Sequence, residues 1–236
     1  MDSQTRHALK HDRFVDTTNA TLDWASENRT TLIRYGIAAL AVIALIVAAI
    51  WTYNIRRQSA ENLLGQGLSI YTTPLRVPGE PAEEAQGSYD TAAARAKAAY
   101  PMLEKAANQY GWLRAGESAR YFAGLADMDM GDRAKAETEL KKAAKAHDRN
   151  IASLAQMALA SLYAQTNRTS QAIDIYNKLI QHPTTAVPAS AAQLQLASLY
   201  ENTNPEKAKQ IYAQVKDKNS KTAAGQIAAQ QLQKLK

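Results

Sequence analysis

The strings LASLYAQTNRTSQAIDIY, residues 159–176, and LASLYENTNPEKAKQIY, residues 196–212, decide the fold. Both begin with the same five letters, and the second lacks one residue in the polar segment that follows. In both strings an alanine, Ala172 or Ala208, is followed four residues later by a tyrosine. A repeat of this length with two helices in each unit predicts an all-α solenoid of helical hairpins.

A third, weaker copy lies upstream of these two strings. Gly131 and Asp132 predict a turn between two helices. Small residues such as Ala119 and Ala123 precede the turn, and Ala136 follows it on the second helix. The solenoid is therefore expected to contain at least three hairpins.

The three copies resemble the tetratricopeptide repeat. That family has small residues where the two helices of a hairpin touch, a turn with glycine or asparagine, and then an alanine followed four positions later by a tyrosine or phenylalanine. The resemblance implies repeats at residues 117–150, 151–186 and 187–219. It also assigns eight residues to packing within the repeats: Gly124, Ala136, Ala160, Ala172, Tyr176, Ala197, Ala208 and Tyr212.

Helical patterns also flank the three repeats. Residues 56–116 are interpreted as a degenerate first repeat with a loop insertion at 72–89, which is rich in proline and glutamate. The insertion is either a disordered segment or a loop that binds a partner. Asp90 is expected to cap the helix that follows the loop. Residues 220–236 are expected to form a helix that caps the stack.

The composition agrees with a helical protein. Alanine, the strongest helix former, supplies 46 of the 236 residues, while glycine and proline together supply 17. The absence of cysteine excludes a disulfide scaffold and a thiol nucleophile. The net charge of +6 comes from basic residues that are interleaved with acids, and this pattern predicts no nucleic-acid partner.

One segment, residues 35–55, has 21 residues without a charge. A helix of this length is about 31 Å long, which matches the hydrocarbon core of a bilayer. The preceding tail, residues 1–34, is too long and too polar for the start of a cleaved signal peptide, so the segment is expected to remain as a transmembrane helix.

Arginines flank this span equally on its two sides. Arg29 and Arg34 precede it, and Arg56 and Arg57 follow it. The further basic residues of the tail favour a cytoplasmic N-terminus by the positive-inside rule. This orientation places the repeats outside the cytoplasm.

No motif for phosphate binding, acyl transfer or metal-dependent hydrolysis is present in the sequence. The chain is therefore expected to be no enzyme, and to need no catalytic residue, cofactor, metal or small-molecule substrate. A protein partner is expected on the inner helices of the solenoid, around Arg120, Gln156 and Gln193. Charge reversal at Arg120 is expected to weaken capture of the partner and to leave the fold intact.

The whole arrangement resembles the YfgM-like ancillary subunit family of the bacterial SecYEG translocon. Trp24 to Arg29, which runs into Leu32 and Gly36, is similar to that family's lead into its span. The resemblance implies a single-pass protein of the inner membrane with a periplasmic repeat domain. Its implied partners are the SecYEG translocon, periplasmic chaperones and unfolded client proteins. Two alternatives stay open: a scaffold for another envelope machine, in outer-membrane assembly or cell division, and a cytoplasmic adaptor with the inverted topology.

Overall fold

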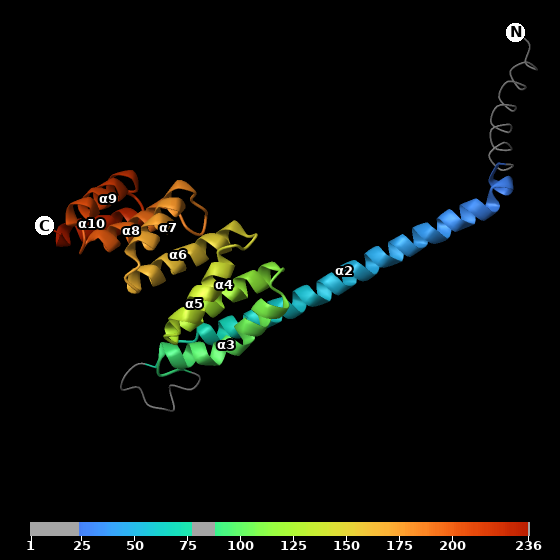
Figure 1. Ribbon diagram of the computed structural model, residues 1–236, viewed down its shortest axis with the longest axis horizontal. Coiled ribbons are helices and arrows are strands. Elements are labelled where there is room, and N and C mark those ends of the chain that lie inside the picture. Colours follow the sequence, from blue (N-terminus) through green and yellow to red (C-terminus); the bar gives the residue numbers. More distant parts are fainter. Residues whose placement is uncertain (1–23, 77–87, 236) are drawn as a thin grey trace, which may run out of the picture. The chain divides into compact units, whose positions relative to one another are not determined.

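The computed structural model describes residues 24–76 and 88–235. In this part of the chain every regular element is a helix, and the helices are labelled α2 to α10 in Figure 1. Within the same part, the only strand-like pairing is an isolated bridge between Leu75 and Tyr89. The predicted all-α class is thus confirmed. Most of the insertion at 72–89 and most of the tail at 1–34 lie outside the described residues, and so does the binding role considered for the loop.

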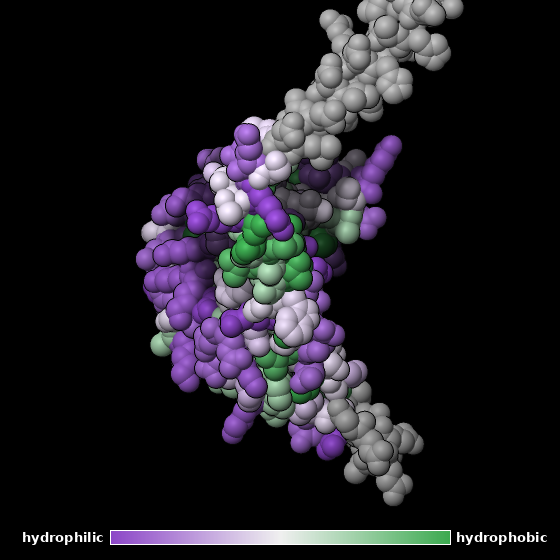
Figure 2. Space-filling view, turned by 90° about the vertical axis from the view of Figure 1, so that its right-hand side faces the viewer, coloured by the Kyte–Doolittle hydropathy of each residue, from purple (hydrophilic) through white to green (hydrophobic). Residues whose placement is uncertain are grey.

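The chain divides into two compact units after Ile55. The first unit contains the beginning of α2, Arg29–Tyr71, a helix of 43 residues. Its apolar side chains are largely exposed: Leu40 is 67% exposed and Leu45 is 71% exposed. In the space-filling view, hydrophobic side chains gather in a green area on the face that is shown (Figure 2). This helix is long and apolar enough to cross a membrane.

The second unit begins at Arg56, and in it the last turns of α2 pack against α3, Ala92–Gln109. Gly67 makes the closest approach, because a Cβ atom at this position would lie 2.7 Å from Leu103 Cδ2. The N-cap of α3 is Thr91, whose side chain accepts a hydrogen bond of 3.1 Å from the N–H of Ala94. The expectation that Asp90 caps this helix is wrong: its carboxylate instead lies 2.9 Å from Arg76.

Three helical hairpins follow. They are formed by α4, Arg114–Asp129, with α5, Arg133–Ala143; by α6, Arg149–Gln165, with α7, Thr169–Gln181; and by α8, Ala189–Tyr200, with α9, Pro205–Lys218. The last helix, α10, Ala223–Lys234, packs against α9. The main contacts join helices that are neighbours in the chain, which is the packing of a solenoid (Figure 1).

The turns inside the hairpins use two different devices. Gly131 and Asn167 have positive φ angles of 79° and 59°, which glycine and asparagine adopt most readily. Asn204 does not follow this pattern. Its φ is −155°, and its side chain accepts a hydrogen bond from the N–H of Lys207, so it is the N-cap of α9. The shorter third turn is thus closed by a cap and by Pro205 at the first helical position.

Small side chains let the paired helices approach each other. A Cβ atom on Gly124 would lie 2.8 Å from Leu140 Cγ, so α4 and α5 touch at the glycine. The structure buries all of the residues that the sequence assigns to packing within the repeats: Gly124, Ala136, Ala160, Ala172, Tyr176, Ala197, Ala208 and Tyr212. The core therefore combines many alanines with several larger side chains, such as Leu162, Tyr176 and Leu179 in the second hairpin.

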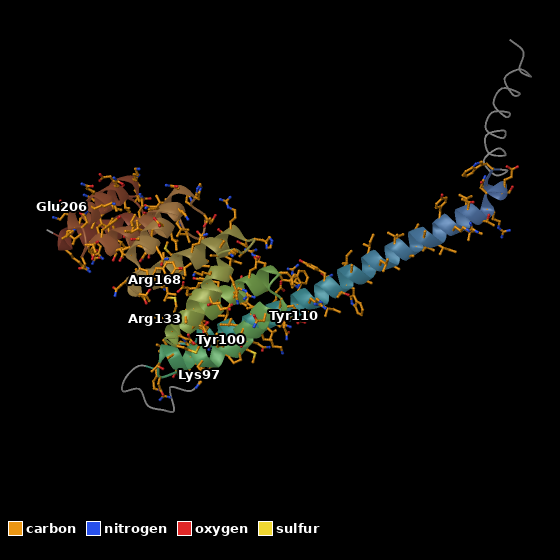
Figure 3. The ribbon with its side chains drawn as sticks, viewed as in Figure 1. Lys97, Tyr100, Tyr110, Arg133, Arg168 and Glu206 are labelled. Atoms are coloured by element: carbon orange, nitrogen blue, oxygen red, sulfur yellow. The ribbon has the colours of Figure 1, made fainter. Side chains whose placement is uncertain are left out.

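Charged contacts join the first of these hairpins to the second. Arg168, labelled in Figure 3, lies 2.7 Å from Glu137 of α5. Its guanidinium carbon also lies 4.2 Å from the centre of the Tyr163 ring, and the Tyr163 hydroxyl donates to Glu137 over 3.1 Å. The side-chain hydrogen bond from Lys141 is the main reason that the pKa of Glu137 is lowered to about 2. Glu137 therefore remains charged at neutral pH and holds the two hairpins in register.

Candidate protein-interaction site

A groove lies between the first helices of two successive hairpins, α6 and α8. It encloses about 270 Å³. Its polar lining comes from α6, from α7, from α8 and from the turn that follows α8: Ser161, Gln165, Tyr176, Gln195, Ser198 and Asn202.

The chemistry of the groove is that of uncharged hydrogen bonding. Gln165, Gln195 and Asn202 carry amides, each of which has both a donor and an acceptor. Burial raises the pKa of Tyr176 to about 12, so its hydroxyl keeps its proton. Paired amides suit the alternating N–H and C=O groups of an extended peptide, and no residue that lines the groove is charged.

Apolar side chains continue the same face of α6 beyond the groove. Leu154 and Met157 are separated from Ser161 by helical spacings of seven and four residues, and both are partly buried against the core. On α8, Leu194 is also partly buried. Methionine and leucine that are half exposed can adapt to different apolar partners.

Arg120 is not available to a partner in the way the sequence suggests. Its guanidinium donates to Glu139 of α5 over 2.8 Å and to the carbonyl of Ala107 over 2.6 Å. The side chain is only 16% exposed. Arg120 is therefore a structural residue that joins α3, α4 and α5, and from these contacts we expect reversal of its charge to destabilise the fold.

The other two predicted partner residues lie apart from the groove. Gln156 lines a different cleft, between α6 and α7. Gln193 is half-buried on α8, where the groove is lined instead by Gln195 and Ser198. Neither this cleft nor the groove is lined by more than one of the three predicted residues.

The repeated string contains a signal that would have located the groove. Ser161 and Ser198 are the third residue of LASLY in the two copies, and both line it. Equivalent positions on α6 and α8 therefore face the same space. The amides of Gln165 and Asn202 follow each serine by four residues, which is one helical turn.

Within the part of the chain that the structure describes, no group of three or more His, Asp or Glu side chains is arranged to hold a metal ion. The site can therefore be considered through its amides, hydroxyls and apolar side chains.

Residues 154–185 and 191–222 match the family model of the tetratricopeptide repeat. Over these residues the two hairpins are similar to tetratricopeptide repeats. They contain most of α6 with α7, and α8 with α9. Tetratricopeptide repeats form scaffolds for protein–protein interaction, so the groove between α6 and α8 lies between two modules of that kind.

A solved structure supports the same fold over more of the chain. It is a tetratricopeptide repeat protein from Parabacteroides merdae, with a TM-score of 0.52 and 19% sequence identity. The match covers 75% of this chain and 60% of that protein, so the chain spans less than two thirds of its length. Among curated proteins, none matches the sequence.

Proposed function

We propose that this protein is a non-enzymatic, membrane-anchored tetratricopeptide repeat protein that binds other proteins outside the cytoplasm. The observation that carries the proposal is a single chain with an exposed apolar helix at one end and tetratricopeptide repeats at the other. The apolar part of α2 would be the anchor. The groove between α6 and α8 would bind an extended segment of the partner through its amides.

We place the protein in the bacterial inner membrane, with the N-terminus in the cytoplasm and the repeats in the periplasm. In this setting it would assist the SecYEG translocon and periplasmic chaperones in handling unfolded secreted or envelope proteins. The support is the resemblance around Trp24 and the order of anchor and repeats. The uncharged groove is consistent with unfolded clients, since its side chains can form hydrogen bonds with a peptide backbone whatever the side chains of that peptide are.

The first test measures the membrane topology. The chain contains no cysteine, so a single introduced cysteine is the only site that a thiol reagent can label. One variant, Lys236→Cys, reports on the repeats, and a matched variant, Ser3→Cys, reports on the tail. A membrane-impermeant thiol reagent is added to cells whose outer membrane is permeabilised. We expect labelling at position 236 and protection at position 3. The reverse pattern would make the protein a cytoplasmic adaptor and would overturn the proposal.

The partner is tested by photocrosslinking from the groove in living cells. A photoreactive amino acid at Gln195 lines the groove, and one at the exposed Lys216 of α9 is the control. Crosslinks from position 195, and not from 216, to SecYEG subunits or to secreted proteins in transit would support the proposal. Crosslinks only to components of outer-membrane assembly or cell division would assign the protein to that other machine.

A further inference from the structure

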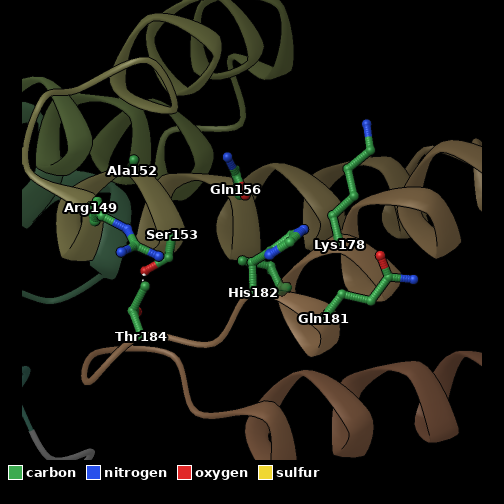
Figure 4. Close-up of a pocket in the computed structure, with 9 residues that line it drawn as sticks. Arg149, Ala152, Ser153, Gln156, Lys178, Gln181, His182 and Thr184 are labelled. Carbon is green, nitrogen blue, oxygen red and sulfur yellow. Dashed lines mark hydrogen bonds between the residues drawn. The ribbon is translucent and has the colours of Figure 1, made fainter.

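A second cleft lies between α6 and α7 and is separate from the groove described above. It encloses about 510 Å³, which is within the usual range for ligand sites. In the close-up, Arg149, Ser153 and Thr184 are grouped at one end, Lys178 lies at the other, and Gln156 and His182 lie between them (Figure 4).

Hydrogen bonds fix the end of this cleft that contains Thr184. The hydroxyls of Ser153 and Thr184 are 2.7 Å apart, and the backbone N–H of Val187 donates to the Thr184 hydroxyl over 3.1 Å. The N–H of Ala186 donates to the side chain of Asn150 over 3.2 Å. The segment that follows α7 is thus tied to the first turn of α6, so the cleft is preformed.

The side chains that line the cleft include three basic groups and no acid. These are Arg149, Lys178 and His182, all of which are exposed. None of them forms an ion pair with a residue in the described ranges 24–76 and 88–235. The neighbouring acid, Asp148, is directed elsewhere: it caps α6, and its carboxylate lies 2.8 Å from Arg114.

Helix dipoles account for only part of this charge. Lys178 lies in the last turn of α7, where a positive charge is favourable. Arg149 is the first residue of α6, where a positive charge is unfavourable. Arg133 is likewise the first residue of α5, so an arginine at the start of a helix does not by itself indicate a binding site. Arg149 differs from Arg133 because two further basic residues line the same cleft.

We propose that the cleft between α6 and α7 binds an acidic peptide segment of a partner protein through Arg149 and Lys178. A single small anion could engage one end of the cleft only, because the two cations lie at opposite ends of it in Figure 4. A peptide with two carboxylates can engage both. The amide of Gln156 can pair with its backbone, and Leu179 and Ala152 add apolar surface to the lining of the cleft. This inference concerns a different site from the groove and holds whichever partner the groove binds.

The test uses the full-length protein in detergent and a fluorescent peptide that alternates glutamate with alanine and leucine and ends in an amide. The matched control peptide has glutamine in place of every glutamate. We expect the acidic peptide alone to raise the fluorescence anisotropy, and added salt to release it. Equal binding of both peptides, or no binding of either, would overturn the proposal.

Two pairs of substitutions locate the binding. In the variant Arg149→Gln with Lys178→Gln, affinity for the acidic peptide is expected to fall by about tenfold or more. The control Arg133→Gln with Lys216→Gln removes the same charge from exposed residues outside the cleft and should leave affinity within about twofold (Figure 3 shows Arg133). An equal loss in both variants would mean attraction to net charge only and would contradict the site.

A further competition separates a peptide site from a simple anion site. Inorganic phosphate at the same ionic strength as sodium chloride should displace the peptide no better than chloride does. Displacement by phosphate at low concentration would show that the cleft binds a small anion, and the peptide proposal would then be wrong. The groove variant Gln195→Ala should bind the acidic peptide normally, which keeps this outcome independent of the proposed function.

Discussion

The carboxylate of Glu117 on α4 accepts a hydrogen bond of 2.7 Å from the backbone N–H of His147, just before α6. The same oxygen lies 2.9 Å from the His147 ring nitrogen Nδ1, and the other carboxylate oxygen accepts from the N–H of Asp148 over 3.3 Å. Glu117 is only 7% exposed. One acidic side chain therefore ties the first helix of one hairpin to the beginning of the next.

Substitution of this residue, Glu117→Gln, is expected to lower the free energy of unfolding by about 1–3 kcal/mol, because two partly buried backbone N–H groups lose a charged acceptor. Urea denaturation followed by circular dichroism measures the change. The control is Glu206→Gln, an exposed residue on α9 that should change stability by less than about 0.5 kcal/mol. Equal stability of wild type and Glu117→Gln would contradict the role of the contact.

The same residue predicts a loss of stability in acid. Burial alone would raise the pKa of Glu117, but the hydrogen bonds from His147 and Asp148 outweigh this effect and lower it below 4.5. The folded state then holds the proton less tightly than the unfolded state. The stabilisation is present above the unfolded pKa and is lost as pH falls through the folded pKa. The stability difference between wild type and Glu117→Gln should therefore shrink on acidification below about pH 4.

Asp127 should have the opposite pH dependence. It is fully buried on α4, and its two carboxylate oxygens have no hydrogen-bond partner among the described residues. Burial, and then the charge of Asp132, raise its pKa from 3.8 to about 6. The folded state therefore binds the proton more tightly, and stability falls as pH rises from 3.8 towards 6.

The variant Asp127→Asn removes this buried charge. We expect it to be more stable than wild type by about 1–3 kcal/mol at pH 8, with the gain disappearing towards pH 4. Thermal melts across this range measure the effect, with the exposed Asp217→Asn as the control. A gain that does not change with pH would show that the charge of Asp127 is not its cause.

Substitution by alanine should change the stability in opposite directions at two glycines that lie within helices. Gly124→Ala places a methyl group 2.8 Å from Leu140 Cγ and is expected to cost about 1–2 kcal/mol of stability. Gly65 on α2 has no heavy atom within 4 Å of the added carbon, so Gly65→Ala should stabilise by about 0.5–1 kcal/mol through helix propensity. A stabilising effect at both positions would contradict the close approach of α4 and α5.

Reversal of the charge at Arg120 should impair folding. Arg120→Glu places two carboxylates where Arg120 and Glu139 are 2.8 Å apart and leaves the Ala107 carbonyl without its donor. We expect a loss of about 3 kcal/mol, which is typical for breaking a largely buried pair. The swap Arg120→Glu with Glu139→Arg should recover part of this loss by restoring opposite charges. A normal melting temperature in the single variant would restore Arg120 as a candidate surface residue.

The repeat pattern predicts the fold well because the same packing contact occurs in each hairpin and requires similar residues at the same spacing. Leu140, Tyr176 and Tyr212 each follow a buried alanine by four residues, and all three are buried. Ala99 and Leu103 on α3 have the same spacing and burial, but the long insertion separates Leu103 from its partner Gly67 and hides the correspondence in the sequence.

The candidate site was harder to predict, because function depends on which side chains remain free after packing. Arg120 is charged and lies on α4, the first helix of its hairpin, but its guanidinium forms an ion pair with Glu139 and is not free to bind a partner. Asp127 stands where the later repeats have the buried Tyr163 and Tyr200, so the repeat register indicates a buried position, whereas an acidic side chain by itself suggests exposure. Asp90 and Thr91 are both good caps, and in the structure Thr91 caps α3 while Asp90 pairs with Arg76.

The main contacts join neighbouring helices, and this arrangement has a consequence for how the molecule comes apart. Support for each hairpin comes from the one beside it, so the stack can fray from α10 inwards while α3 and α4 stay folded. A protease would then shorten the protein step by step instead of destroying it in one event. A peptide bound between α6 and α8 would contact two hairpins at once. Its binding would be detected because the protease would stop shortening the protein at these hairpins.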